Sequence, residues 1–211
     1  MKNMVSRLQS TPHTVMPVCC CMILALLLIA CGGGTTSTST PAPTPQPSPT
    51  PSPTPTPGLT LYTGKGYSIS YPQGWKVTPS GDSALFTSES GVYSLAIAVN
   101  SNPHGIINGS TFANDSISGT KKTMKNTQTE TLPPTTTVGG DSWVQKSISG
   151  TETSNGVSVG VEIQVVVISD DHPANAANTR NFTIVYGAEK SLFATANTSY
   201  FQPMLNSFKF T

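Results

Sequence analysis

The part of the chain from residue 59 to residue 211 predicts an α+β fold, in which an antiparallel β-sheet is flanked by helices. Three observations lead to this prediction. Several short segments alternate apolar and polar residues with the period of two that half-buried strands show. Asn155-Gly156 separates two such segments, and this dipeptide favours the two-residue turn of a β-hairpin. Two further segments place apolar residues three or four positions apart, which is the spacing of an amphipathic helix.

Five strands are predicted before the first helix. Each is a short apolar or alternating run that ends in a turn, such as Pro72-Gln73-Gly74 after the second strand. In the last of the five, the odd-numbered positions share one face, while Ala96 and Ala98 lie on the other. Small apolar residues on this second face lead us to expect that a helix covers it. The five strands are Leu59–Thr63, Tyr67–Tyr71, Trp75–Val77, Ala84–Phe86 and Val92–Val99.

A loop (Asn100–Ser110) and a helix (Thr111–Asn126) follow. Ser110 is the expected N-cap, because its hydroxyl can accept a hydrogen bond from the first turn. Gly119 weakens the helix by about 1 kcal/mol relative to Ala. The apolar stripe consists of Ala113, Ile117, Thr120 and Met124. A lysine cluster, which we expect to be a solvated face rather than a lipid or phosphate patch, consists of Lys121, Lys122 and Lys125.

Four strands are predicted in the second half of the domain. Gly139-Gly140 forms a tight turn after the first of them, and Asn155-Gly156 joins the next two. Val166 and Ile168 make the end of the third strand apolar on both faces, as in a strand at the centre of a sheet. A polar loop at residues 169–181 precedes the fourth. The strands are Thr135–Val138, Trp143–Glu152, Val157–Ile168 and Phe182–Tyr186.

The last segment predicts two helices and an edge strand. The first helix is short and spans Glu189–Ala196. The second begins near Ser199, which has capping-box spacing to Gln202, and Pro203 has to lie in its first turn. Its apolar stripe consists of Tyr200, Phe201, Met204, Leu205 and Phe208. Lys209–Thr211 forms the final strand.

Both ends of this region resemble a known family. Gly66–Trp75 (GYSISYPQGW) is similar to the opening aromatic–x–apolar–x–Tyr-Pro-x-x-Trp run of PsbP-like domains, and Phe201–Phe210 is similar to their closing helix and Ser-Phe strand. The resemblance covers residues 59–211 and implies a PsbP-like α/β/α sandwich of the PsbP/LpqN/DcrB type. Members of this group act mostly by binding and bind different things, so the fold does not fix the function. No binding residue of the family has a matching motif here.

The N-terminus has the layout of a secretory signal peptide. Lys2 and Arg7 precede an apolar run at residues 18–30, which is shorter than the roughly 20 residues of a membrane-spanning helix. The run ends in Leu28-Ile29-Ala30-Cys31, which resembles the bacterial lipoprotein signal. The resemblance implies cleavage after residue 30, a diacylglyceryl group on the Cys31 sulfur and attachment to the extracytoplasmic face of the cell membrane. An ordinary secretory signal and an uncleaved anchor are the alternatives.

A linker follows at residues 31–58, in which every second residue from Pro41 to Pro57 is proline. Such a segment has no apolar surface to bury, and residues 41–57 at about 3.1 Å each give an extended spacer of roughly 50 Å. A docking ligand for a proline-binding partner is the alternative to a passive spacer. The chain thus divides into a signal peptide (1–30), the lipidated Cys31 with its linker (31–58) and a PsbP-like globular domain (59–211).

The globular domain offers few residues for catalysis. All 4 cysteines lie at or before Cys31, so the domain can form no disulfide or thiolate site. The one Gly-x-Ser-x-Gly run, Gly156–Gly160, lies at the start of a predicted β-strand rather than in a strand-to-helix turn, and no Gly-rich nucleotide motif occurs. Weak metal candidates are Asp170, Asp171 and His172, because carboxylates and imidazole bind cations; a solvated turn is the alternative. We therefore predict no catalytic residue, no cofactor and no resident metal.

Charge and aromatic residues indicate a binding function. With 11 basic and 10 acidic residues the charge is nearly balanced, which argues against a nucleic-acid partner. Four aromatic residues are candidates for a ligand groove, although aromatic residues at alternate strand positions are more typical of a core. These residues are Trp75, Trp143, Tyr67 and Tyr71.

The sequence therefore predicts a lipid-anchored extracytoplasmic protein whose domain is a binding or scaffolding module. Its partner is expected to be an envelope protein or a small apolar ligand. A small envelope hydrolase or cation-dependent enzyme is the first alternative, and a solute-capture protein for a transporter is the second. We expect no enzymatic activity, because no catalytic set of residues is visible in the sequence.

Overall fold

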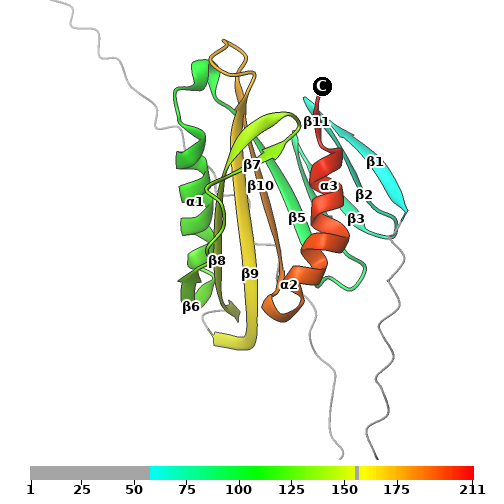
Figure 1. The fold of residues 1–211 in the computed structure, drawn as a ribbon, viewed down its shortest axis with the longest axis vertical. Coiled ribbons are helices and arrows are strands. Elements are labelled where there is room, and N and C mark those ends of the chain that lie inside the picture. The colour runs from blue at the N-terminus through cyan, green and yellow to red at the C-terminus, as the bar shows by residue number, and fades with distance from the viewer. Residues whose placement is uncertain (1–57, 155–156) are drawn as a thin grey trace, which may run out of the picture.

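The computed structural model describes residues 58–154 and 157–211. At its centre is an 8-stranded antiparallel sheet in the order β3-β4-β5-β10-β9-β8-β6, with β7 paired to β8 outside this path (Figure 1). Its strands are β3 (Lys76–Ser80), β4 (Ser83–Thr87), β5 (Ser94–Ser101), β6 (Met124–Thr129), β7 (Thr135–Val138), β8 (Asp141–Ser154), β9 (Val157–His172) and β10 (Arg180–Glu189).

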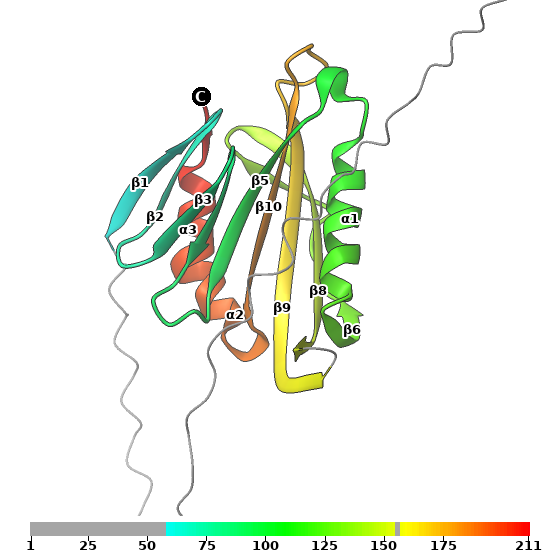
Figure 2. The ribbon, with the colours of Figure 1, turned by 180° about the vertical axis from the view of Figure 1, so that it is seen from behind.

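Helices pack on both faces of this sheet (Figures 1 and 2). Helix α1 (Gly109–Lys121) lies against β8 and β9, where Val165 and Val167 pack under Ile117. Val166 and Ile168 alternate with these residues along β9, so their side chains point to the opposite face of the sheet. There they pack in a second core, under the C-terminal helices. This arrangement confirms the predicted α+β class and the prediction that β9 is apolar on both faces.

A second, 3-stranded sheet contains the first and the last strand of the chain. It has the order β1-β2-β11, formed by β1 (Leu59–Gly64), β2 (Tyr67–Pro72) and β11 (Lys209–Phe210). Tyr67 and Ile69 of β2 are fully buried in one cluster with Phe208, so this sheet closes the second core. The sequence predicted an antiparallel sheet but did not predict that β1, β2 and β11 form a second, smaller one. The turn at residues 72–75 carries the chain from one sheet to the other, which no local pattern shows.

Helix α1 begins and ends earlier than predicted. Its N-cap is Asn108, whose side-chain Oδ1 accepts a hydrogen bond from the backbone N–H of Ser110 at 2.8 Å. The last turn closes as the backbone N–H of Lys122 bonds to the carbonyl of Gly119 at 3.1 Å. Met124 is therefore not on the helix but begins β6, a mostly exposed edge strand without an alternating pattern. The lysines of the predicted solvated cluster are all exposed: Lys121, Lys122 and Lys125.

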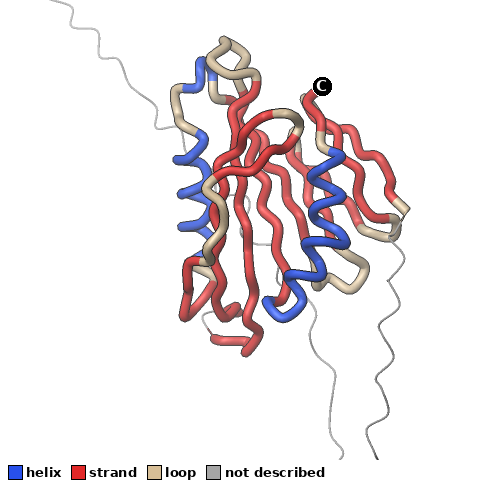
Figure 3. Tube along the Cα trace, in the orientation of Figure 1, coloured by secondary structure: helices blue, strands red, loops and turns tan. Residues whose placement is uncertain are grey.

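The C-terminal helices run together instead of forming the two separate helices that the sequence predicts (Figure 3). Helix α2 (Lys190–Ala196) continues through a π-helical segment, η2 (Asn197–Phe201), into α3 (Gln202–Ser207). The backbone N–H of Gln202 bonds to the carbonyl of Asn197, five residues back. This wider turn precedes Pro203, which has no N–H and clashes with the carbonyl four residues earlier in an ordinary α-helix. The predicted capping box at Ser199 does not form, because Ser199 lies within the continuous helix.

The predicted hairpins join paired strands. Gly139 and Gly140 have φ of 62° and 94° in the turn between β7 and β8, as the tight hairpin turn requires. The register of β8 and β9 continues to the pair Ser154–Val157, which confirms the second hairpin. Its turn residues, Asn155-Gly156, lie outside the described residues.

The polar loop between β9 and β10 is shorter than the sequence predicts. β9 continues to His172 and β10 begins at Arg180, and these two residues pair in the sheet. The end of β9 and the start of β10 were predicted as part of the loop because their residues are polar. Their side chains bond across the sheet instead, with Asn181 Nδ2 donating to Ser169 Oγ at 3.0 Å and Ser169 Oγ lying 3.1 Å from Thr183 Oγ1.

The signal peptide, Cys31 and the linker up to residue 57 lie outside the described residues, so the predictions for them remain predictions. Within the described part of the chain, the helices are too short or too polar for any of them to traverse a lipid bilayer.

Candidate functional site

A surface pocket of about 460 Å³ is lined by three aromatic side chains from segments far apart in the sequence. These are Trp75 after β2, Tyr93 before β5 and Tyr200 on η2. We call this site the aromatic pocket. Its polar rim consists of Gln73, Ser88, Glu89 and Ser90.

The turn after β2 places Trp75 in the pocket. The carbonyl of Pro72 accepts a hydrogen bond from the backbone N–H of Trp75 at 3.1 Å, and Gly74 has a φ of 90°. A type II turn needs such a positive φ at its third residue, which Gly adopts without steric cost. The backbone N–H of Gln73 donates to the carbonyl of Gly58 at 2.7 Å, so the first described residue of the chain is attached to this turn.

The turn between β4 and β5 holds Tyr93 through a serine. The backbone N–H of Ser88 donates to the carbonyl of Tyr93 at 2.9 Å, and the N–H of Tyr93 donates back to Ser88 Oγ at 3.0 Å. Ser90 Oγ lies 3.3 Å from Ser88 Oγ. These bonds close the turn, and they explain why β5 begins at Ser94 rather than at the predicted Val92.

The π-helical segment presents neighbouring aromatic residues to different surroundings. Phe201 is fully buried and packs on Tyr186, with ring centroids 5.0 Å apart. Tyr200 is half-buried and lines the aromatic pocket. Insertions of this kind in helices are frequently found at functional sites.

The three aromatic rings of the pocket form one contiguous surface. Their centroids are 6.5 Å apart for Trp75 and Tyr93, 5.8 Å for Trp75 and Tyr200, and 5.2 Å for Tyr93 and Tyr200. Each ring is half-buried, which leaves part of it available to a ligand. Aromatic rings of this kind bind apolar groups and C–H-rich rings through dispersion and burial.

The electrostatics of the pocket disfavour an anionic ligand. Among the described residues that line it, none carries a positive charge, and Glu89 is exposed. Burial, then the neighbouring Tyr200 phenol and the Glu189 carboxylate, raises the pKa of Tyr93. Its hydroxyl therefore remains protonated and can donate a hydrogen bond.

The four aromatic candidates from the sequence divide between core and pocket. Tyr67 and Trp143 are fully buried, and Trp143 Nε1 donates to the carbonyl of Val138 at 2.9 Å, so both belong to the core. Tyr71 is half-buried and packs on Phe86 with centroids 5.4 Å apart. Only Trp75 of the four lines the aromatic pocket.

Tyr93 and Tyr200 were missed as site residues, because the sequence predicted them as parts of apolar stripes. No local signal separates Tyr200 from its neighbour Phe201, because the buried pair Met204 and Leu205 shows that adjacent residues of this helical segment can both pack in the core.

The three metal candidates do not converge. Asp170 and His172 lie on one face of β9, and Asp171 lies on the other. Asp171 Oδ1 accepts hydrogen bonds from Asn102 Nδ2 at 3.0 Å and Asn181 Nδ2 at 2.9 Å. Over residues 58–154 and 157–211, no group of three or more His, Cys, Asp and Glu side chains is placed to hold a metal ion.

His172 links β9 to two other strands. Its Nδ1 lies 2.7 Å from Asp141 Oδ2 at the start of β8. Its ring lies flat on Phe210 of β11, with centroids 3.7 Å apart. This geometry holds the last strand against the large sheet.

Asp170 is a half-buried residue with one buried carboxyl oxygen. Its Oδ2 is inaccessible and accepts no hydrogen bond from any described residue. Burial, aided by the negative charges of Asp141 and Asp171, raises its pKa to about 6, although the backbone N–H of Asp171 and the nearby His172 lower it.

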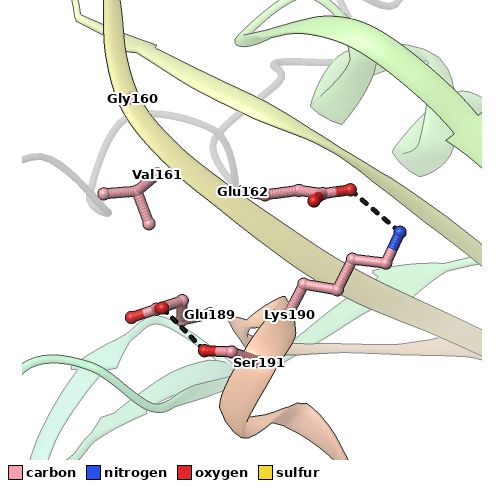
Figure 4. Close-up of a pocket in the computed structure, with 6 residues that line it drawn as sticks. All are labelled: Gly160, Val161, Glu162, Glu189, Lys190 and Ser191. Carbon is pink, nitrogen blue, oxygen red and sulfur yellow. Dashed lines mark hydrogen bonds and ion pairs between the residues drawn. The ribbon is translucent and has the colours of Figure 1, made fainter.

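A second surface pocket, of about 490 Å³, lies where β9 meets the start of α2. Figure 4 shows Lys190 paired with Glu162, and Ser191 bonded to Glu189. Lys190 Nζ lies 2.8 Å from Glu162 Oε1 and 3.1 Å from Glu130 Oε1, and these carboxylates raise the pKa of Lys190. Ser191 Oγ donates to Glu189 Oε1 at 2.7 Å. These bonds fasten α2 to the sheet, so the aromatic pocket is the better candidate for ligand binding.

Comparison with known proteins adds a likeness of fold. No family model and no curated protein matches the chain. The fold is similar to a solved structure described as the crystal structure of LpqN involved in cell envelope biogenesis of Mycobacterium tuberculosis, with a TM-score of 0.46, 12% identity, and coverage of 73% of this chain and 91% of that chain. This likeness is too distant to support an inference about function. Membership of the PsbP-like family therefore stays a prediction.

Proposed function

We propose that this chain is a lipid-anchored extracytoplasmic binding protein and that the aromatic pocket is its ligand site. The observation that carries the proposal is the contiguous surface of Trp75, Tyr93 and Tyr200, bordered by hydrogen-bonding groups. A site with an apolar surface and a few placed polar groups is typical of ligand binding.

The ligand that fits this pocket is neutral and combines flat apolar faces with hydrogen-bonding groups. The aromatic rings supply the apolar contact, and the rim residues Gln73, Ser88 and Ser90 supply donors and acceptors. An anionic ligand is disfavoured, because the described lining residues offer Glu89 but no cation. An envelope polypeptide or a small neutral molecule has the required chemistry.

The sequence supports the proposed location. The Leu28-Ile29-Ala30-Cys31 motif supports lipidation of Cys31, and the proline-rich linker supports a spacer between the membrane and the domain. The hydrolase and solute-capture alternatives gain no specific observation in the described residues, and we therefore propose binding rather than catalysis.

Binding can be measured by titrating the protein with a panel of neutral oligosaccharides and proline-rich peptides while recording tryptophan fluorescence and heat. Tyr200→Ala and Trp75→Ala are expected to weaken binding of the best ligand roughly ten-fold each, because an aromatic contact contributes about 0.5–1.5 kcal/mol beyond its buried area. Calorimetry gives the affinity of the Trp75 variant, which has lost the fluorescent reporter.

Phe112→Ala is the matched control. Phe112 is a half-buried aromatic residue on α1, which packs on the opposite face of the large sheet from η2. It is expected to leave the affinity unchanged. Full affinity in a Trp75→Ala/Tyr200→Ala double variant would contradict the proposed site.

A further inference from the structure

We infer that the aromatic pocket binds the chain's own alternating-proline segment, residues 51–57, in a polyproline conformation. This inference rests on the proposed function and names the ligand of the same site. It follows from where the chain enters the domain, from the spacing of the rings and from the charge of both partners.

The chain enters the domain at the edge of the pocket. Gln73 lines the aromatic pocket, and its backbone N–H bonds to the carbonyl of Gly58 at 2.7 Å. Leu59 pairs with Pro72 at the end of β2, and the two strands are antiparallel. Gly58, the first described residue, therefore lies on the side of β1 where the turn at residues 72–75 and its pocket lie. Pro57 directly precedes Gly58 in the chain.

The three rings form one compact aromatic surface, because their centroids are mutually separated by 5.2, 5.8 and 6.5 Å. A polyproline helix has three residues per turn and rises about 3.1 Å per residue, so one turn of about 9 Å can lie against such a surface. Aromatic-lined grooves are a recurrent binding site for proline-rich segments, whose rings lie against the aromatic faces.

The charge and the hydrogen-bonding groups also match. Residues 41–57 contain no charged residue, and no described residue lining the pocket is cationic. Proline lacks an N–H, so a proline-rich segment offers mainly carbonyl acceptors. Tyr93 and the side-chain amide of Gln73, which line the pocket, are donors that such carbonyls need.

Attachment to the same chain makes a weak contact sufficient. A short covalent connection produces an effective concentration of about millimolar, and a polyproline segment loses little conformational entropy on binding. The docked segment shortens the reach of the linker. An external ligand then has to displace the segment, which lowers its apparent affinity.

The full chain, purified in detergent micelles, contains its own reporter. It has 2 tryptophans, and Trp143 is fully buried, so acrylamide quenching of tryptophan fluorescence reports chiefly on Trp75. The test variant carries Pro51→Ser, Pro53→Ser, Pro55→Ser and Pro57→Ser. The matched control carries Pro41→Ser, Pro43→Ser, Pro45→Ser and Pro47→Ser. Both sets lie outside the domain, so the Tm of the domain is expected to stay unchanged.

Quenching of Trp75 is expected to rise roughly two-fold in the test variant, because a covered ring becomes accessible, and to stay at the wild-type value in the control. Equal quenching in all three proteins would overturn the inference. Protection of Trp75 that grows with protein concentration would also overturn it, since the occupant would then be a second copy.

Added ligands separate this inference from the proposed function. If the test variant quenches like the wild type but a neutral oligosaccharide protects Trp75, the aromatic pocket is a ligand site and its occupant is not the proline segment. If neither the segment nor any ligand of the panel protects Trp75, both proposals fail.

Discussion

Asp170 and Asp171 are adjacent in the sequence but have different surroundings, because β9 places their side chains on opposite faces. The Asp171 carboxylate accepts hydrogen bonds from two asparagine amides. Asp170 has a buried oxygen with no hydrogen bond from the described residues and a pKa raised to about 6. The pair shows that the chemistry of a side chain depends on the face it occupies.

The raised pKa of Asp170 predicts a pH-dependent stability. The pKa of Asp170 is about 6 in the folded state and about 3.9 in the unfolded state. Its contribution to the free energy of unfolding is therefore fully present below pH 4 and is lost as the pH rises through 6. The Asp170→Asn variant has no carboxyl to ionise at this position, so it does not lose this stability as the pH rises. The variant is expected to be more stable than the wild type at pH 7.5 and nearly equal at pH 4; the gain at pH 7.5 is about 1–2 kcal/mol, because Asp170 is partly exposed and solvent screens its charge.

Urea denaturation at the two pH values checks this expectation. Asp171→Asn is the control, and it is expected to give no gain at pH 7.5, because the Asp171 carboxylate is already hydrogen-bonded. A wild type as stable as Asp170→Asn at pH 7.5 would show that the carboxyl is not destabilised by burial.

At the level of elements, a Gly→Ala substitution is expected to have opposite effects on stability at Gly119 and at Gly187. A Cβ at Gly119, inside α1, meets nothing within 4 Å, whereas a Cβ at Gly187, in β10, lies 2.9 Å from the Gln164 carbonyl oxygen. Gly119→Ala is expected to stabilise the protein by about 0.5–1 kcal/mol through helix propensity. Gly187→Ala is expected to cost about 1–3 kcal/mol, because the backbone of β9 has to move.

Urea denaturation gives the free energy of unfolding of each glycine variant, which is compared with that of the wild type. If Gly187→Ala is tolerated as well as Gly119→Ala, the packing of β9 against β10 is looser than the structure describes.

Elements whose local pattern agrees with their packing were predicted well. The hairpin of β8 and β9 follows from the period of two and from Asn155-Gly156, both of which are local. The end of α1 was misplaced because Met124 continues the apolar stripe in sequence while its backbone pairs with β8. Met124 still packs with Ile117, so the contact was predicted but the element was not.

At the level of the whole molecule, one lipidated residue is expected to hold the domain at the membrane. The two acyl chains predicted on Cys31 would contribute about 0.8 kcal/mol per buried methylene, which is sufficient for stable anchoring. In a bacterial host, Cys31→Ser is expected to shift the protein from the detergent phase to the aqueous phase. The matched control, Cys21→Ser, is expected to stay in the detergent phase.

Mass spectrometry of the N-terminal peptide completes this test. A mature wild-type protein with an unmodified Cys31, or one with its leader still attached, would contradict the predicted anchor and location.

The sequence by itself determined the α+β class, both hairpins and the apolar nature of both faces of β9, because period and turn residues report on neighbours along the chain. Only the tertiary structure decided which aromatic residues reach the surface together. Trp75, Tyr93 and Tyr200 come from three separate segments, and their proximity depends on how the small sheet and the π-helical segment pack over the core. Such proximity has no local pattern, since it arises from contacts between residues far apart in the chain.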